Sequence, residues 1–245
     1  MPKPTLPDWE DVLSAAVRLQ EILPEAVLVG GTGAALHVGH RISVDGDHVL
    51  TDLRSHFDEV LAQLESVAGW KTARVQRPVQ ILGNLDGIDT GVRQLFRTEP
   101  LETTEIEHQG RMVRVPTEPE MLRIKGVLIL KRNSTRDYLD FVAIADHLGD
   151  ERSADALRSF DRLYPQASGE SALHQLHVQL ATPLPFDLAK TKLPEYKHLA
   201  VRWHRWEAVT DRAAKLARTL FDKLAVAPPG RAPQRPPRGR GGPGL

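Results

Sequence analysis

The chain has 245 residues, of which 41% are hydrophobic and 26% charged, and its 32 Lys and Arg balance its 32 Asp and Glu. This composition is ordinary for a folded protein and excludes a disordered or fibrous chain as a whole. The absence of cysteine excludes disulfides, thiolate metal sites and cysteine nucleophiles.

A membrane protein is not expected, since no apolar run approaches the ~20 residues that span a bilayer. Residues 1–10 are acidic and proline-rich, unlike a signal peptide. The sequence therefore predicts a cytoplasmic protein with no membrane partner.

Helical and extended patterns alternate along the first half of the chain. The pattern predicts helices over 9–23, 32–38 and 52–68, and strands over 26–29, 42–50, 70–76, 78–82, 87–96 and 111–115. From Pro116 onward it is almost wholly helical, ending in a long helix over 201–226. A mixed sheet with flanking helices, followed by a helical C-terminal region, is an α/β (α+β) fold.

Three regions are predicted along the chain: a catalytic-type domain over 1–149, a helical domain over 150–226, and a tail over 227–245. The tail contains 6 Pro, 5 Gly and 4 Arg. Such a stretch cannot bury enough apolar surface to offset the entropy of ordering it, so we expect it to be disordered.

The first candidate site is Gly30-Gly31-Thr32, which follows the strand at 26–29 directly. Glycines at such a turn allow backbone N–H groups to approach a ligand closely, and a helix starting there attracts phosphate. The alternative is a tight turn in which Thr32 caps a helix.

The second candidate is the pair Asp45 and Asp47. Residues two apart in an extended segment point to the same face, so the carboxylates would lie side by side and require a cation. Mg²⁺ is typically held by one or two carboxylates together with substrate phosphates. The alternative is a hairpin turn at Asp45-Gly46, a common turn pair.

The third candidate lies on a helix that Thr117 and Glu120 predict as a capping box. Lys125 stands among apolar residues of this helix, and Arg132, seven residues later, is on the same face. The alternative for Lys125 is an ordinary solvated lysine.

Asp140 is expected on the next helix, surrounded by apolar residues, where a carboxylate needs a partner. Lys125 is the candidate partner. Asp137 belongs to the first turn of that helix, and the helix dipole alone explains an acid there.

Several short motifs together resemble the AbiEii/AbiGii toxin nucleotidyltransferase family, part of the DNA polymerase β-like nucleotidyltransferase superfamily. They are Val29-Gly30-Gly31-Thr32, residues 41–47, Pro119-Glu120 with Leu122 and Lys125, and Arg132 with residues 136–140, in that order over about residues 26–148. Gly46 departs from the apolar residue that the family usually has between its two metal aspartates.

The resemblance implies a nucleotidyltransferase-type mixed sheet and a Mg²⁺-dependent transfer from an NTP. It implies a phosphate turn at Gly30, Gly31 and Thr32, metal carboxylates at Asp45 and Asp47, and a catalytic lysine and aspartate at Lys125 and Asp140. Arg132 is expected to help bind the nucleotide, and Asp89 is a weaker candidate for a third carboxylate on a later strand. Such proteins act as toxins of bacterial toxin-antitoxin or phage-defence systems, and some transfer nucleotides to the acceptor end of tRNA. An NTP, a tRNA and a cognate antitoxin are therefore the implied partners.

Two other functions stay open from the sequence. One is a small-molecule nucleotidyltransferase of the antibiotic-modifying kind. The other is a binding module whose catalytic site has decayed, an interpretation suggested by Gly46 between the two aspartates. Trp203 with Trp206 is expected to be helix core rather than a base-stacking pair. His174 with His177 is expected to be a packed or surface pair rather than a zinc site.

Overall fold

The computed structural model describes residues 7–225, so the tail predicted over 227–245 lies outside the described residues. The described helices are α1 (Trp9–Ile22), α2 (Gly30–Val38), α3 (Phe57–Glu65), α4 (Glu118–Arg132), α5 (Thr135–Leu148), α6 (Asp150–Leu157), α7 (Phe160–Leu163), α8 (Ala172–Ala181) and α9 (Trp206–Ala225). The strands are β1 (Val27–Leu28), β2 (Gly46–Leu50), β3 (Trp70–Gln76), β4 (Gln80–Leu85), β5 (Ile88–Gln94), β6 (Thr103–His108) and β7 (Arg111–Pro116). The mixed α+β fold predicted from the sequence is confirmed.

The strands form a five-stranded sheet in the order β1-β2-β5-β4-β3, and a separate hairpin of β6 and β7. Only β2 and β5 run parallel to each other within the five-stranded sheet. The sequence pattern missed β6, whose side chains are mostly exposed and so show no clear apolar alternation.

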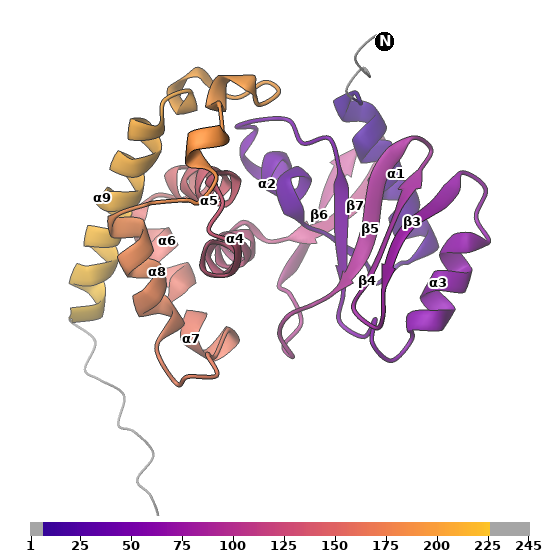
Figure 1. The fold of residues 1–245 in the computed structure, drawn as a ribbon, viewed down its shortest axis with the longest axis horizontal. Coiled ribbons are helices and arrows are strands. Elements are labelled where there is room, and N and C mark those ends of the chain that lie inside the picture. Colours follow the sequence, from indigo (N-terminus) through magenta and orange to yellow (C-terminus); the bar gives the residue numbers. More distant parts are fainter. Residues whose placement is uncertain (1–6, 226–245) are drawn as a thin grey trace, which may run out of the picture.

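One face of the sheet packs on α1 and α3 through a cluster of buried side chains. Helix α1 contributes Leu19, and Leu23 follows directly after it. Helix α3 contributes Phe57 and Leu64, and the sheet contributes residues such as Ile81 and Val92. Figure 1 shows these elements in one half of the molecule and α4 to α9 in the other, with α2 between them.

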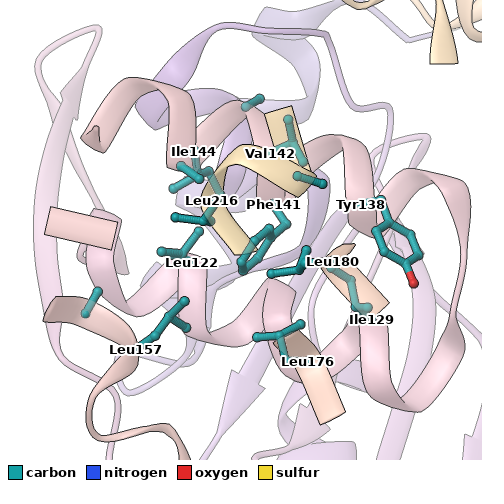
Figure 2. Packing of buried hydrophobic residues seen from close by; sticks show 14 of the residues in the cluster. Leu122, Ile129, Tyr138, Phe141, Val142, Ile144, Leu157, Leu176, Leu180 and Leu216 are labelled. Atoms are coloured by element: carbon teal, nitrogen blue, oxygen red, sulfur yellow. The ribbon is translucent and has the colours of Figure 1, made fainter. Parts of the chain in front are cut away.

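The helical half has its own core, to which α4, α5, α6, α8 and α9 all contribute. Figure 2 shows Leu122 and Phe141 packed with Leu157, Leu176 and Leu216 in this cluster. Helices on both sides of residue 149 therefore share one core, and the boundary at 149/150 stays a prediction. None of the helices described is long and apolar enough to cross a membrane.

The last helix is shorter than its apolar spacing predicted. It begins at Trp206, and Trp203 belongs instead to a 3-10 turn (Val201–Trp203). Trp203 is buried, and Trp206 packs edge-on against Tyr138 with ring centroids 6.0 Å apart. Trp203 is thus core, as expected.

His48 on β2 makes stability depend on pH. The side chain is fully buried, and its Nδ1 lies 2.9 Å from the Gly46 carbonyl oxygen, which can only accept a hydrogen bond. Burial lowers the pKa of His48 from 6.5 to about 4. Between these values the unfolded chain binds more protons than the folded one, so the free energy of unfolding falls as pH drops.

We expect the lowered pKa of His48 to reduce the free energy of unfolding by about 3 kcal/mol as the pH falls from about 7 to about 4, at about 1.4 kcal/mol per unit of pKa. Urea denaturation of wild type and His48→Gln over this pH range measures it, and the variant should lose that part of the pH dependence. His56→Gln, at an exposed histidine, is the control and should keep it. Equal pH dependence in wild type and His48→Gln would show that the buried imidazole is not responsible.

Candidate active site

The turn from β1 into α2 places Gly30 against β2 and Gly31 against the residues that precede it. Gly30 has φ +71°, a backbone conformation that side chains disfavour, and a Cβ there would lie 3.3 Å from the Cβ of Asp47. Helix α2 begins at Gly30, two residues before the predicted start, with Val29 at its N-cap. The first amides of a helix have no intrahelical acceptor, so those of Gly30 and Gly31 are donors available to an anion.

Gly31 is required by its neighbours in the fold. A Cβ at this position would lie 2.5 Å from a terminal nitrogen of Arg41 and 2.6 Å from the Ser43 hydroxyl. Thr32 is fully buried, and its hydroxyl donates to the Asp45 carbonyl oxygen at 2.5 Å. The side chain of Thr32 therefore positions Asp45, and phosphate contact at this turn stays a prediction.

Asp45 and Asp47 flank the start of β2. The Ser43 hydroxyl donates to Asp45 Oδ1 at 2.7 Å, and Arg93 on β5 donates to Asp47 Oδ1 at 3.0 Å. Gly46 is the first residue of the strand and pairs with Thr90 of β5. The hairpin-turn alternative for Asp45-Gly46 is therefore wrong.

The two aspartates fit a divalent cation by the chemistry of their donors. Their Oδ1 atoms are held by Ser43 and Arg93, while no protein hydrogen bond among the described residues engages either Oδ2. The space beside Asp47 Oδ2 is the one that a Cβ on Gly30 would enter, at 3.5 Å. Mg²⁺ needs few protein carboxylates, because substrate phosphates and water complete its shell.

A third carboxylate is not found at this place. Asp89 accepts a hydrogen bond from Asn84 in the β4–β5 hairpin, and no group of three or more His, Asp or Glu in residues 7–225 is arranged to hold a metal. On β5, the residue that pairs with Asp47 is Gly91, which has no side chain. The side chain of β5 that contacts Asp47 is that of Arg93. The two aspartates are therefore the metal candidates.

The Asp140 carboxylate is the centre of a second, buried cluster. Lys125 donates to its Oδ2 at 2.7 Å, which confirms the predicted pairing. Arg41 donates to both oxygens, at 2.8 and 3.0 Å, and His40 Nε2 lies 2.7 Å from Oδ1. Lys125 is 1% exposed and Asp140 is fully buried, so the solvated alternative for Lys125 is wrong.

The charges of this cluster stabilise one another. Burial acts to raise the pKa of Asp140, but Arg41, Lys125 and His40 outweigh it and hold the pKa well below its usual value. Burial acts to lower the pKa of Arg41, and the Asp140 and Asp45 carboxylates raise it overall. Lys125 and Arg41 face the carboxylate of Asp140 and, at 3.9 Å from Lys125 Nζ, that of Asp137, so the buried charges balance.

Asp137 has more partners than its place in the first helical turn explains. It is fully buried, and it accepts from Arg132 at 3.1 Å and from the Ser134 hydroxyl at 2.8 Å. Its Oδ1 lies 3.9 Å from Lys125 Nζ. Arg132 is 46% exposed, so it links the buried aspartates to solvent, and nucleotide binding by Arg132 stays a prediction.

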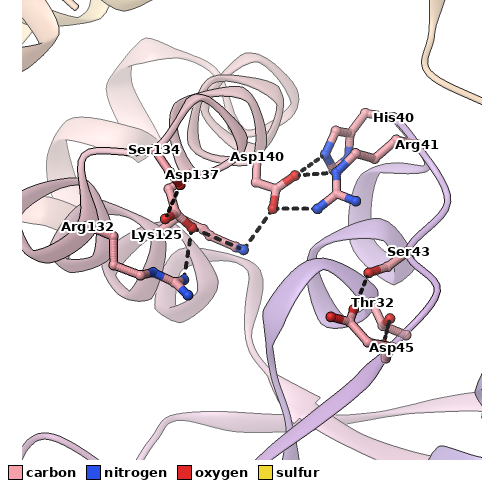
Figure 3. Close-up of polar contacts among 10 residues, drawn as sticks. All are labelled: Thr32, His40, Arg41, Ser43, Asp45, Lys125, Arg132, Ser134, Asp137 and Asp140. Carbon is pink, nitrogen blue, oxygen red and sulfur yellow. Dashed lines mark hydrogen bonds and ion pairs between the residues drawn. The ribbon is translucent and has the colours of Figure 1, made fainter. Parts of the chain in front are cut away.

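Arg41 joins the two clusters. Figure 3 shows its guanidinium between Asp140 and the group formed by Ser43, Thr32 and Asp45. The same terminal nitrogen, Nη2, that donates to Asp140 lies 2.5 Å from the place that a Cβ on Gly31 would take. All four sequence motifs thus meet around one arginine.

The sequence alone assigned no role to His40, Arg41 or Arg93. Each is a polar residue whose partner is remote in the chain: Asp140 is 100 residues from His40, and Asp47 is 46 residues from Arg93. Only the position of Arg41 and Ser43 next to the aspartate pair hinted at them. Spacing within a motif cannot show which distant residue a side chain meets.

No family model matches the chain. A stretch of 130 residues is 35% identical to heme uptake protein MmpL11 of Mycobacterium tuberculosis (strain ATCC 25618 / H37Rv), covering 52% of this chain and 13% of that protein. The chain thus spans only a small part of the length of the curated relatives it matches, and heme uptake is an activity of that protein.

Among solved structures, the chain is similar to a candidate nucleotidyltransferase from H. pylori, with TM-score 0.53 and 16% identity over 89% of this chain and 95% of that one. The antibiotic-resistance factor ANT(2'')-Ia has TM-score 0.48 and 12% identity, over 62% of this chain and 91% of that one. The chain has a nucleotidyltransferase fold. At these identities the likeness defines the fold alone.

Proposed function

We propose that the chain is a Mg²⁺-dependent nucleotidyltransferase that moves a nucleoside monophosphate from an NTP to an acceptor hydroxyl. The observation that carries this proposal is the place of the α2 glycine turn: Gly30 lies against Asp47, and Gly31 lies against Arg41, which pairs with Asp140, the partner of Lys125. The fold is consistent with it.

In the proposed reaction the acceptor oxygen bonds to the α-phosphorus, the bond to the bridging oxygen breaks, pyrophosphate leaves, and the hydroxyl proton passes to solvent. Mg²⁺ held by Asp45 and Asp47 supplies charge neutralisation and lowers the pKa of the attacking hydroxyl. The amides of Gly30 and Gly31 hold outer phosphate oxygens, as helix N-termini do.

Arg41 is the cation best placed to stabilise charge on the triphosphate, because it pairs with Asp140 and its Nη2 also lies beside Gly31 of the α2 turn. Lys125 and Asp140 are buried and have almost no surface accessible to solvent. We assign them to position Arg41, and direct contact of Lys125 with the triphosphate stays a prediction.

Gly46 does not by itself argue for a decayed site. Gly46 pairs with Thr90 of β5, and its carbonyl oxygen accepts from the Thr90 hydroxyl, so the strand between the two aspartates is intact. The site is therefore proposed as active.

The resemblance to AbiEii/AbiGii toxins supports a more specific proposal: a toxin of a toxin-antitoxin or phage-defence system, with a cognate antitoxin and tRNA as an acceptor. Induced expression of the chain in a bacterial host should then arrest growth. Arg41→Gln should relieve the arrest because it removes the charge that joins the two clusters. Growth arrest by both proteins at equal expression would separate toxicity from this site.

The biochemical test is incubation of purified protein with Mg²⁺, each labelled NTP and total tRNA. Transfer of label that requires Mg²⁺ and is lost in Arg41→Gln is the expected result. Folding of the variant is checked by circular dichroism. Arg205→Gln, at an exposed arginine that pairs only with Glu207 among the described residues, is the matched control and should retain activity. Absence of Mg²⁺-dependent NTP binding by the wild type would overturn the proposal.

A further inference from the structure

The connection between α8 and α9 returns to the first half of the molecule at the candidate active site. The amide of Ile42 donates to the carbonyl oxygen of Lys197, and the carbonyl oxygen of His40 accepts from the amide of Ala200, both at 2.8 Å. Ile42 and His40 are the residues on either side of Arg41. This connection, in orange in Figure 1, therefore holds the backbone of Arg41 from both sides.

An aromatic ring of the same connection contacts the side chain of Arg41. Arg41 Cζ lies 5.8 Å from the centroid of the Tyr196 ring, within the distance of about 6 Å at which a cation is attracted to an aromatic face. Tyr196 is half-buried, and burial raises the pKa of its hydroxyl, which is therefore protonated at neutral pH. Residues 196–200 thus hold both the side chain and the backbone of Arg41.

The guanidinium of Arg41 needs this second contact to have a defined orientation. Its Nε and Nη2 donate to Asp140, and these two parallel hydrogen bonds fix one edge of the planar group. The ring of Tyr196 limits how far the plane can tilt about that edge. No hydrogen bond joins Nη1 to any residue in the described range, so Nη1 is the donor left for a ligand.

The 196–200 segment is itself fixed to other parts of the fold. The Lys197 ammonium donates to the Pro7 carbonyl oxygen at 2.6 Å, just before α1. Leu199 is buried in the core of the helical half, and its carbonyl oxygen lies 2.9 Å from His204 Nε2. The segment is therefore anchored in both halves of the molecule and can act as a rigid support.

Resting on the function proposed above, in which Arg41 contacts the triphosphate, we propose that Tyr196 is a positioning residue for NTP binding. Its ring keeps the Arg41 guanidinium beside Gly31 of the α2 turn, and the backbone of residues 196–200 fixes the connection that carries Arg41. The nucleotide site therefore depends on residues of the helical half as well as on the glycine turn and the aspartate pair.

The test is fluorescence anisotropy of fluorescent analogues of ATP, CTP, GTP and UTP with Mg²⁺. Tyr196→Leu should weaken binding of the NTP that the wild type prefers by about three- to tenfold, the loss expected for a partly buried cation–π contact. Tyr196→Phe keeps the ring and should bind as the wild type does. Tyr164→Leu is the matched control, because the ring of Tyr164 lies over Arg97 instead, at 5.6 Å, and it should keep wild-type affinity.

A double variant separates positioning from a general loss of stability. If Tyr196 acts through Arg41, Tyr196→Leu should cause no further loss of NTP affinity in the Arg41→Gln protein, because the two residues are then fully coupled. A residue that only stabilises the fold would lower the thermal midpoint and leave the Kd of the folded protein unchanged. Thermal midpoints are therefore recorded, and binding is measured well below them.

A pair of proline variants tests the backbone part of the support. Ala200 has φ −59°, which suits proline, so Ala200→Pro removes the amide that donates to His40 without strain at φ. It should weaken NTP binding by at least about threefold, as the loss of one hydrogen bond predicts. Val201→Pro is the control and should bind normally. Val201 is exposed and begins a 3-10 turn, and its amide has no acceptor in residues 7–225.

Wild-type affinity in both Tyr196→Leu and Ala200→Pro, together with weakened binding in Arg41→Gln, would overturn the positioning role and leave the proposed function intact. An equal loss from Tyr196→Leu with and without Arg41→Gln would also overturn it. If the wild type binds no NTP in the presence of Mg²⁺, the proposed function itself has failed.

Discussion

Replacing Asp45 by asparagine should lower the rate of nucleotide transfer by about 100-fold or more, the loss typical of removing a charge-stabilising group from an active site. The asparagine side chain keeps the shape of the aspartate and can still accept from the Ser43 hydroxyl, which donates to Asp45 at 2.7 Å. The variant loses the negative charge that holds Mg²⁺. Its effect should therefore fall on metal-dependent transfer and hardly on folding.

The measurement is transfer of labelled nucleotide as a function of Mg²⁺ concentration, with the thermal midpoint of each protein recorded beside it. Asp58→Asn is the matched control, since Asp58 is an exposed aspartate on α3 that pairs only with Arg77 among the described residues. It should leave transfer unchanged. An Asp45→Asn protein with wild-type rate and metal dependence would remove this residue from the metal site.

Asp140→Ala should destabilise the fold by about 3 to 5 kcal/mol, because removing one partner of a buried ionic cluster leaves the others uncompensated. Lys125, Arg41 and His40 would all lose their shared acceptor in a place without solvent. The lowered pKa of Asp140 has the same cause, so its carboxylate stays ionised to lower pH than an ordinary aspartate.

Urea denaturation at neutral pH measures this loss of stability. Asp155→Ala is the control, because Asp155 is an exposed residue whose pairing with Arg158 is worth about 0 to 1 kcal/mol. Asp140→Asn retains the volume and one acceptor oxygen, so it should fall between wild type and Asp140→Ala. A loss as small as that of the control would mean that the buried cluster does not stabilise the fold.

Local sequence determined much of the framework. Thr117 caps α4 by accepting from the Glu120 amide, and Pro119 occupies the first turn, as predicted. The second bond of the capping box is absent, because the Thr117 amide donates to the Glu102 carbonyl oxygen and the Glu120 carboxylate pairs with arginines. Strand β3 has the predicted bounds, 70–76. These features depend on neighbours within a few residues, which a reader of the sequence can see.

The pairing of Lys125 with Asp140 could also be predicted, because a buried carboxylate needs a cation and the two stand on consecutive helices. The other partners of Asp140 could not. His40 and Arg41 lie in the connection between α2 and β2, where charged side chains are usually exposed, yet both are buried. Packing of the helical half against α2 decides their burial.

Two Asp-Gly pairs show where local information ends. Asp86-Gly87 forms the turn of the β4–β5 hairpin, with φ of +53° and +92°, as the dipeptide favours. Asp45-Gly46 has the same two residues but enters a strand, because Gly46 pairs with Thr90 of β5, a parallel neighbour 44 residues away. The sequence by itself thus determined caps, turns and one ion pair, whereas the tertiary structure decided which aspartates came together, since hydrogen bonds from a remote strand outweighed the turn preference of the dipeptide.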